Sequence, residues 1–356
     1  YFPCSLVHHG FSMMKVDIAT IQSVSPSKPS DRLTRLVLAD VAGQWDAFQT
    51  WNNIVFYYKD TRHDVWRLSG LLRDSLSAAL VAHPLLSGRL MPCDGQTQRG
   101  ELEIVANDGG VRFVEGMSDV TVNEFLCLNE SDGDLETQLV FGLSIDPIDS
   151  RFSPLFSVQV TRFKCGGLSI GVSGSILLGG IMEMRGFVKR WGEIHSDKST
   201  TEDDAVMPIY YLPYFKDTLT QLTPSPLKSK CQTLFFSFEG KEEQPLETLW
   251  WVCVSEAESK LGRGMQRDVP VVVFSGSKMT KLEKYKRSER VGNSGVKFAN
   301  EWIWEDLCGE KGILVYGQQH VNASYWVSSL VGGLIIAASS FSLPSDCLIS
   351  VSVRQL

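Results

Sequence analysis

The residues best placed to do chemistry lie in one stretch, where small residues give way to charged ones. Ser173 and Ser175 are separated by a glycine, and Glu183 and Arg185 follow a Gly-Gly pair. A serine hydroxyl attacks an acyl carbon only when a neighbouring base takes its proton. No local His, Lys or Asp is spaced to serve Ser175. We name all four residues as substrate-channel candidates, with a solvated helix face as the default interpretation of Glu183 and Arg185.

A general base would therefore have to come from elsewhere in the chain, and histidine is the side chain whose pKa suits neutral pH. His83 precedes Pro84 at the expected end of a helix, so it should face carbonyl groups or solvent. His195 should lie beyond the site, and His320 precedes a predicted strand. None of the histidines is expected to be the base. The six are His8, His9, His63, His83, His195 and His320.

Composition excludes several classes of protein. The chain has 356 residues, enough for two ordinary domains or one large one. Hydrophobic residues make up 43% and charged residues 21%, as in ordinary globular proteins. A net charge of -7 argues against nucleic-acid binding. The longest apolar run, residues 331–338, is too short to cross a bilayer, so no transmembrane segment is expected.

Cysteine spacing indicates reduced thiols rather than disulfides or a metal site. None of the 8 cysteines forms a C-x-x-C pair, which argues against zinc. Residues 1–13 lack the charged and apolar regions of a signal peptide and are treated as an N-terminal extension. We therefore expect a cytoplasmic protein without a metal. The cysteines are Cys4, Cys93, Cys127, Cys165, Cys231, Cys253, Cys308 and Cys347.

Hydrophobic periodicity and capping signals predict three helices. Leucines that recur every four residues predict a helix over 65–80, which should end near Pro84. Thr121 and Glu124 form a capping box that opens a short second helix. An apolar face predicts a third helix over 245–261.

Alternating residues predict strands between these helices. Residues 156–163 and 168–173 surround a Gly-Gly turn and should form a hairpin. Residues 100–105 should pair with a strand that begins at 111, after a turn rich in Asn, Asp and Gly. The basic stretch 278–297 is expected to be a solvated loop or helix face. Further strands are predicted at 15–21, 54–58, 231–238, 269–275, 313–316, 325–331, 334–338 and 347–353.

A polar segment containing prolines divides the chain. Residues 196–230 are expected to form a crossover linker between domains at 14–195 and 231–356. Because strands and helices alternate, the fold class is α/β, or α+β, with a mixed sheet.

The stretch that contains Ser173, Ser175, Glu183 and Arg185 resembles the active-site strand of the plant BAHD acyltransferases. The motif of that family is His-x-x-x-Asp-Gly. In register, Ser175 takes the His position, Gly179 the Asp position and Gly180 the Gly position. The family's Asp-Phe-Gly-Trp-Gly motif is missing, since Tyr316-Gly317 runs almost directly into Gln318. Other segments keep the order and spacing of the family. They are 24–29, 71–77, 84–90, 107–113, 153–168 and 231–238.

This resemblance implies a two-domain, chloramphenicol-acetyltransferase-like mixed-sheet architecture with a shortened second domain. In active members, the motif histidine takes a proton from an alcohol or amine, which then attacks the thioester of acyl-CoA. A serine has no pKa suited to that step. Residues 163–168 look most similar to the Eceriferum and Glossy wax proteins of the family, which act in very-long-chain fatty acid elongation.

Three functions stay open. The first is a non-catalytic accessory of fatty-acid elongation and cuticular wax synthesis in plants, contacting a condensing enzyme at the cytosolic face of the endoplasmic reticulum. The second is an active acyl-CoA-dependent O- or N-acyltransferase with a non-standard base. The third is a decayed copy that folds poorly. We expect a monomer with no permanently bound cofactor and acyl-CoA as the co-substrate of any transfer. Trp250-Trp251 and Trp302-Ile-Trp304 could line an acyl tunnel, although such pairs more often pack in a core.

Overall fold

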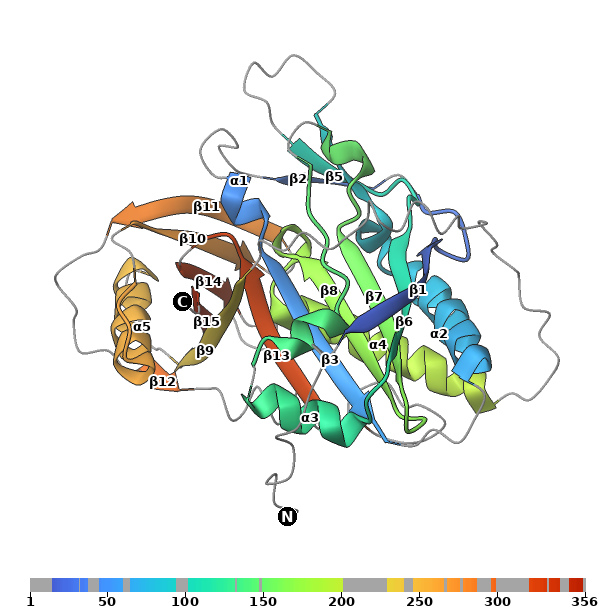
Figure 1. The fold of residues 1–356 in the computed structure, drawn as a ribbon. Helices are drawn as coiled ribbons and strands as arrows, with labels where there is room; N and C mark the ends of the chain where they lie inside the picture. The colour runs from blue at the N-terminus through green and yellow to red at the C-terminus, as the bar shows by residue number, and fades with distance from the viewer. Residues whose placement is uncertain are drawn as a thin grey trace.

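The structure is a computed structural model in which strands and helices alternate, as the sequence predicts (Figure 1). The strand predicted at 313–316, the N-terminal extension and most of the linker lie outside the described residues. The described residues are 15–31, 33–37, 45–59, 65–93, 102–131, 133–146, 149–200, 229–239, 246–265, 268–275, 278–286, 296–298, 320–331, 333–339 and 346–354.

Within these ranges, one 12-stranded mixed sheet runs through both halves of the chain (Figure 1). Most neighbouring strands are antiparallel, but β6 with β7 and β10 with β14 are parallel. In spatial order the strands are β1 (Val16–Val24), β6 (Val111–Ser118), β7 (Phe156–Phe163), β8 (Leu168–Ser175), β3 (Trp51–Tyr58), β13 (Asn322–Ser329), β9 (Ser229–Glu239), β15 (Asp346–Arg354), β14 (Gly333–Ser339), β10 (Asp268–Ser275) and β11 (Lys278–Lys286), with β12 (Val296–Phe298) beside β9.

The hairpin predicted around the Gly-Gly turn is confirmed. Strands β7 and β8 pair antiparallel from Phe156 opposite Gly174 to Arg162 opposite Leu168. Strand β8 also pairs with β3 on its other side, so it lies in the middle of the sheet and is buried along its length. The end of β8, where Ser175 stands, is therefore held by hydrogen bonds from both neighbours.

The other predicted hairpin is wrong. Strand β5 (Leu102–Val105) joins a separate three-stranded sheet with β2 (Thr34–Val37) and β4 (Arg89–Pro92). Strand β6 instead pairs with β1 and β7 in the large sheet. The connection contains two left-handed residues, Asp108 with φ 53° and Gly110 with φ 79°. They turn the chain from one sheet into the other rather than back on itself.

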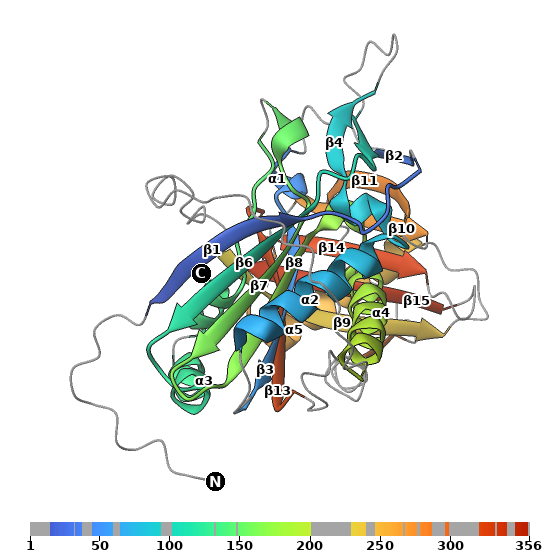
Figure 2. The same ribbon diagram turned by 90° about the vertical axis from the view of Figure 1, so that its right-hand side faces the viewer.

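Two helices cover the sheet beside the strands of the first half (Figure 2). Helix α2 (Val65–Leu80) has the predicted bounds, and the leucines at 68, 72, 76 and 80 are fully buried. It packs against α4 (Ile181–Thr200), which follows β8. Because α4 continues to Thr200, the first five residues of the expected linker, 196–200, are helical. The division into two domains stays a prediction.

The capping box and the third helix are also confirmed. Thr121 N donates to Glu124 Oε2 at 2.8 Å, and Glu124 N donates to Thr121 Oγ1 at 3.2 Å, at the start of α3 (Val122–Ser131). Helix α5 (Leu246–Leu261) buries Trp250 and Trp251 in a core shared with β10, β14 and β15. These two tryptophans therefore pack in a core rather than line a tunnel, while residues 302–304 lie outside the described ranges.

The basic stretch 278–297 is not a helix face or loop throughout, since β11 lies within it and β12 begins in it. Strand β11 is the last in the sheet order and pairs with β10 on one side. Lysines are common on such edge strands, because their charge discourages pairing with another chain. The repeated lysines of Lys278–Lys286 are therefore typical of an edge strand.

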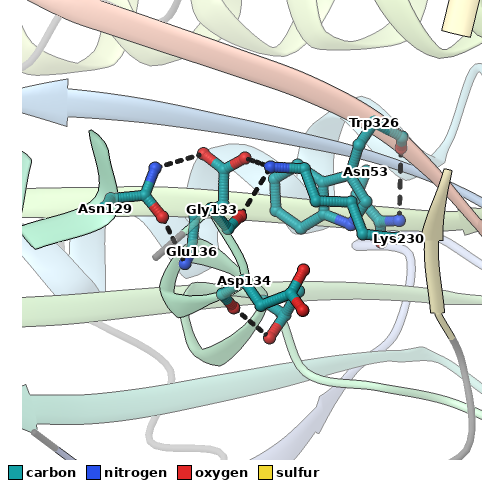
Figure 3. A network of polar contacts seen from close by, with 8 residues as sticks. Asn53, Asn129, Gly133, Asp134, Glu136, Lys230 and Trp326 are labelled. Atoms are coloured by element: carbon teal, nitrogen blue, oxygen red, sulfur yellow. Dashed lines mark hydrogen bonds and ion pairs between the residues drawn. The ribbon is translucent and has the colours of Figure 1, made fainter. Parts of the chain in front are cut away.

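The two halves meet at β13, which pairs with β3 of the first half and β9 of the second. A polar network fastens the start of β9 beside this point (Figure 3). Lys230 forms an ion pair with Glu136, donates to Gly133 O at 2.7 Å, and lies 5.5 Å from the ring centre of Trp326. The Glu136 side chain is 5% exposed and that of Lys230 16%.

Candidate functional site

Ser175 ends strand β8 and caps the short helix that follows, η5 (Ile176–Leu178). Its Oγ accepts a hydrogen bond from Leu177 N at 3.2 Å, and the residue is buried. The backbone is fixed as well, since Ser175 N donates to Leu155 O at 2.9 Å. The hydroxyl oxygen at the motif's histidine position is therefore used as a helix cap.

Gly179 occupies a backbone conformation that only glycine adopts readily. Its φ is 144° and its ψ 179°. A Cβ at this position would lie 2.8 Å from Glu183 Cγ, and Asn52 Nδ2 holds the Gly179 carbonyl at 3.2 Å. The loop at the motif's aspartate position is thus built around glycine, and Glu183 occupies the space that a side chain would need.

Glu183 stands at the start of α4, where its Oε2 accepts a hydrogen bond from Gly180 N at 2.9 Å. Burial raises the pKa of Glu183, and backbone hydrogen bonds and the charge of Arg35 oppose that rise. Arg35 Nη2 in turn donates to the carbonyls of Leu177 and Leu178 at 3.1 and 3.0 Å. The solvated helix face expected for Glu183 is therefore wrong.

These groups surround a cavity of about 230 Å³ at the end of β8. It lies between the turn after α2, strand β2 and the first turns of α4, and most of its walls are apolar side chains such as Leu86, Phe156 and Phe187. An apolar pocket with a few polar groups is typical of small-molecule sites. The polar and charged side chains that line it are Arg35, Asn52, His83, Ser175 and Glu183.

His83 also lines this cavity, which corrects the expectation that it faces carbonyls or solvent. It precedes the short helix η2 (Pro84–Ser87), and its side chain caps no backbone group there. The imidazole packs edge-on against Phe187, with ring centres 5.2 Å apart. Burial, and then the charge of Arg190, lower the pKa of His83. The neutral imidazole is therefore the form present at neutral pH.

The structure brings together two of the four channel candidates. Ser175 and Glu183 line the cavity, whereas Ser173 and Arg185 do not. Ser173 lies opposite Asn53 of β3, and its buried Oγ donates to Asn53 Oδ1 at 2.7 Å. Arg185 is half-buried on α4, and that burial lowers its pKa.

The sequence did not single out the cavity residues Arg35 and Asn52, and its pattern assigned the third, His83, to carbonyl groups or solvent. Arg35 bonds to Leu177 across 142 positions of sequence and Asn52 to Gly179 across 127, so no local pattern joins them. The one usable signal was the position of His83 directly before the matching segment 84–90.

The other described histidines lie elsewhere, as expected. His320 packs against the rings of Phe56 and Tyr58, at 5.1 and 6.4 Å between centres. His195 is buried in α4, with Nδ1 3.2 Å from Ser75 Oγ. His8, His9 and His63 fall outside the described ranges.

Ser75→Ala should cost about 1–3 kcal/mol of unfolding free energy. Its hydroxyl accepts from Trp191 Nε1 at 2.9 Å in the interface between α2 and α4, so the substitution leaves a buried N–H without that acceptor. Urea unfolding would measure the loss. The control is Ser196→Ala, whose hydroxyl bonds back to Gly192 O in its own helix and which should change stability far less. Equal effects of the two substitutions would contradict the assignment.

No group of three or more His, Cys, Asp and Glu side chains among the described residues could hold a metal ion. In the same residues, no helix is long and apolar enough to span a membrane.

Curated proteins with similar sequences include two Eceriferum proteins and an O-acetyltransferase. Protein ECERIFERUM 26-like of Arabidopsis thaliana is 30% identical over 264 residues, or 65% of this chain and 60% of that protein. Protein ECERIFERUM 2 of the same plant is 33% identical over 38% of this chain and 32% of its own length. Taxadien-5-alpha-ol O-acetyltransferase of Taxus chinensis is 40% identical over 29% of this chain and 22% of its own. The chain thus spans less than two thirds of these curated relatives.

Among solved structures, vinorine synthase is similar at 14% identity and a TM-score of 0.45, covering 96% of this chain and 95% of its own. A family model described as the Transferase family matches residues 14–232, which is more than half of the chain. The motif frame at Ser175, Gly179 and Gly180 lies inside that match. The chain therefore belongs to the Transferase family, the BAHD acyltransferases.

Proposed function

We propose that this protein assists very-long-chain fatty acid elongation, and through it cuticular wax synthesis, as an accessory to a condensing enzyme. The Eceriferum relatives and the resemblance at residues 163–168 support this assignment within the family. The residues at the three motif positions perform no acid–base step in this role.

The observation that carries the proposal is the loop at Gly179. Its backbone conformation and the adjacent Glu183 exclude the family's aspartate, and the Ser175 oxygen is used as a cap. Nevertheless the strand, the turn and α4 are all formed, with a cavity beside them. A fold that is kept while its motif is replaced favours a role in binding over the family's usual transfer.

The same proposal includes a ligand, a partner and a cellular location. The apolar walls of the cavity suit a segment of acyl chain, so an acyl-CoA is the ligand that we infer. The partner is a fatty-acid elongase condensing enzyme, which the protein would contact at the cytosolic face of the endoplasmic reticulum. It would do so as a monomer with no permanently bound cofactor.

Co-expression in yeast with a plant condensing enzyme tests this role. The fatty-acid profile should shift to longer chains than the condensing enzyme produces alone. Ser175→Ala should give the same shift, because the proposed role does not use that hydroxyl. An unchanged profile, with both proteins detected by immunoblot, would contradict the proposal for the partner tested.

A further inference from the structure

One side chain in the cavity has acid–base capacity that the proposed accessory role does not use. His83 is the one histidine among the described residues that lines the cavity containing Ser175 and Glu183. It enters from the turn after α2, whereas the motif comes from the end of β8. A base at this position would thus reach the same space from a different element of the fold.

The position of His83 is well defined. The backbone turn is closed by His83 N donating to Leu80 O at 3.0 Å and Leu86 N donating to His83 O at 3.1 Å. Pro84 follows directly and restricts the chain. Phe187 packs against the ring at an angle of 81° between planes. The imidazole is therefore held at the cavity wall by a fixed turn and an aromatic contact.

The surroundings keep the imidazole neutral and so able to accept a proton. Arg190 on α4 is the positive charge that acts on it, and burial adds to the effect. Glu183 and Arg35 are the other charged groups of the cavity. The Glu183 carboxylate accepts from Gly180 N, while Arg35 donates to two carbonyls, so each has a structural role of its own.

We propose that His83 is the general base of a slow acyl-thioester cleavage in this cavity. His83 takes the proton from the hydroxyl of an acceptor, an alcohol or water, and that oxygen adds to the thioester carbonyl carbon. The C–S bond then breaks, and the departing thiolate receives the proton from the imidazolium. The products are an ester, or an acid when water is the acceptor, and a free thiol. This activity goes beyond the accessory role, which requires no cleavage.

The test is release of free thiol from hexanoyl-CoA by the purified full-length chain, with and without a primary alcohol. The wild-type rate should exceed the uncatalysed rate, and His83→Gln should lower it by about 10²–10⁴-fold, the usual contribution of a general base. The control is His320→Gln, which removes an imidazole that contacts Phe56 and Tyr58 and should leave the rate unchanged. Thermal melts of all three proteins establish that each is folded.

Two further readouts separate catalysis from structure. The wild-type rate should fall as the pH drops through the lowered pKa of His83, because only the neutral imidazole is a base. Glu183, Arg35 and Arg190 are the other charges that could shape this profile. His83→Ala should regain activity when imidazole is added, which a merely structural histidine would not allow.

Several results would overturn the proposal. They are no thiol release by folded wild-type protein, an unchanged rate in His83→Gln, or loss of the rate in Glu183→Gln with none in His83→Gln. The yeast experiment is independent of all three, since His83→Gln should still lengthen the fatty acids there. Failure of one proposal is thereby distinguished from failure of the other.

Discussion

Gly179→Asp is expected to lower the free energy of unfolding by about 2–6 kcal/mol. A backbone with φ 144° and ψ 179° costs a residue with a side chain about 1–3 kcal/mol. The new Cβ would also lie 2.8 Å from Glu183 Cγ, and overpacking of this kind costs about as much again. Urea unfolding monitored by tryptophan fluorescence would measure the change.

A matched control is available seven residues along the chain. Gly186 lies in α4, and a Cβ built there meets nothing within 4 Å, so Gly186→Asp should change the unfolding free energy by no more than about 0.5 kcal/mol. Adding Glu183→Ala to Gly179→Asp should relieve the collision but not the backbone strain. If Gly179→Asp alone proves as harmless as Gly186→Asp, the loop is not built around glycine.

The same geometry explains why the family's chemistry should not return when its motif is restored. Ser175→His with Gly179→Asp replaces both residue types, yet the aspartate would have no unstrained place in the loop. The histidine would also remove the cap on Leu177 N. Restoring the motif would thus require a change at Glu183 as well as at the two motif positions, because Glu183 occupies the space beside Gly179.

Features decided by neighbouring residues could be predicted from the sequence. The bounds of α2 follow from leucines at every fourth position and the stop at Pro84, both local properties of the chain. The capping box at Thr121 and the hairpin of β7 and β8 depend on residues a few positions apart. The motif frame at Ser175 was equally visible, because its spacing is local.

Features decided by tertiary packing could not be predicted from the sequence. The turn containing Asp108 and Gly110 was recognised, but nothing local reveals that it leads into another sheet. His83 was assigned to carbonyls or solvent because its sequence position, at a helix end before a proline, says nothing of α4 lying opposite. Glu183 likewise has the pattern of an exposed helix residue, and only the fold places it against Gly179.

The ion pair between Lys230 and Glu136 gives the second prediction, and it concerns the junction of the two halves (Figure 3). Lys230→Met should lower the unfolding free energy by about 3 kcal/mol, near the lower end of the cost of breaking a buried pair. The reason is that the Glu136 carboxylate would lose its ion-pair partner in a site where it is 5% exposed. Asn129 Nδ2, which lies 3.4 Å from Glu136 Oε2, would still donate to it.

Replacing both partners should cost much less than replacing the lysine alone. In Lys230→Met with Glu136→Gln no charge is left buried, and removal of a whole buried pair is often close to neutral. The exposed pair Lys260–Glu256 on α5 supplies the control, since Lys260→Met should cost at most about 1 kcal/mol. A double-mutant cycle in urea measures the coupling. If Lys230→Met and Lys260→Met prove equally mild, the attachment of β9 to the first half depends on its strand pairing with β13 rather than on this charge.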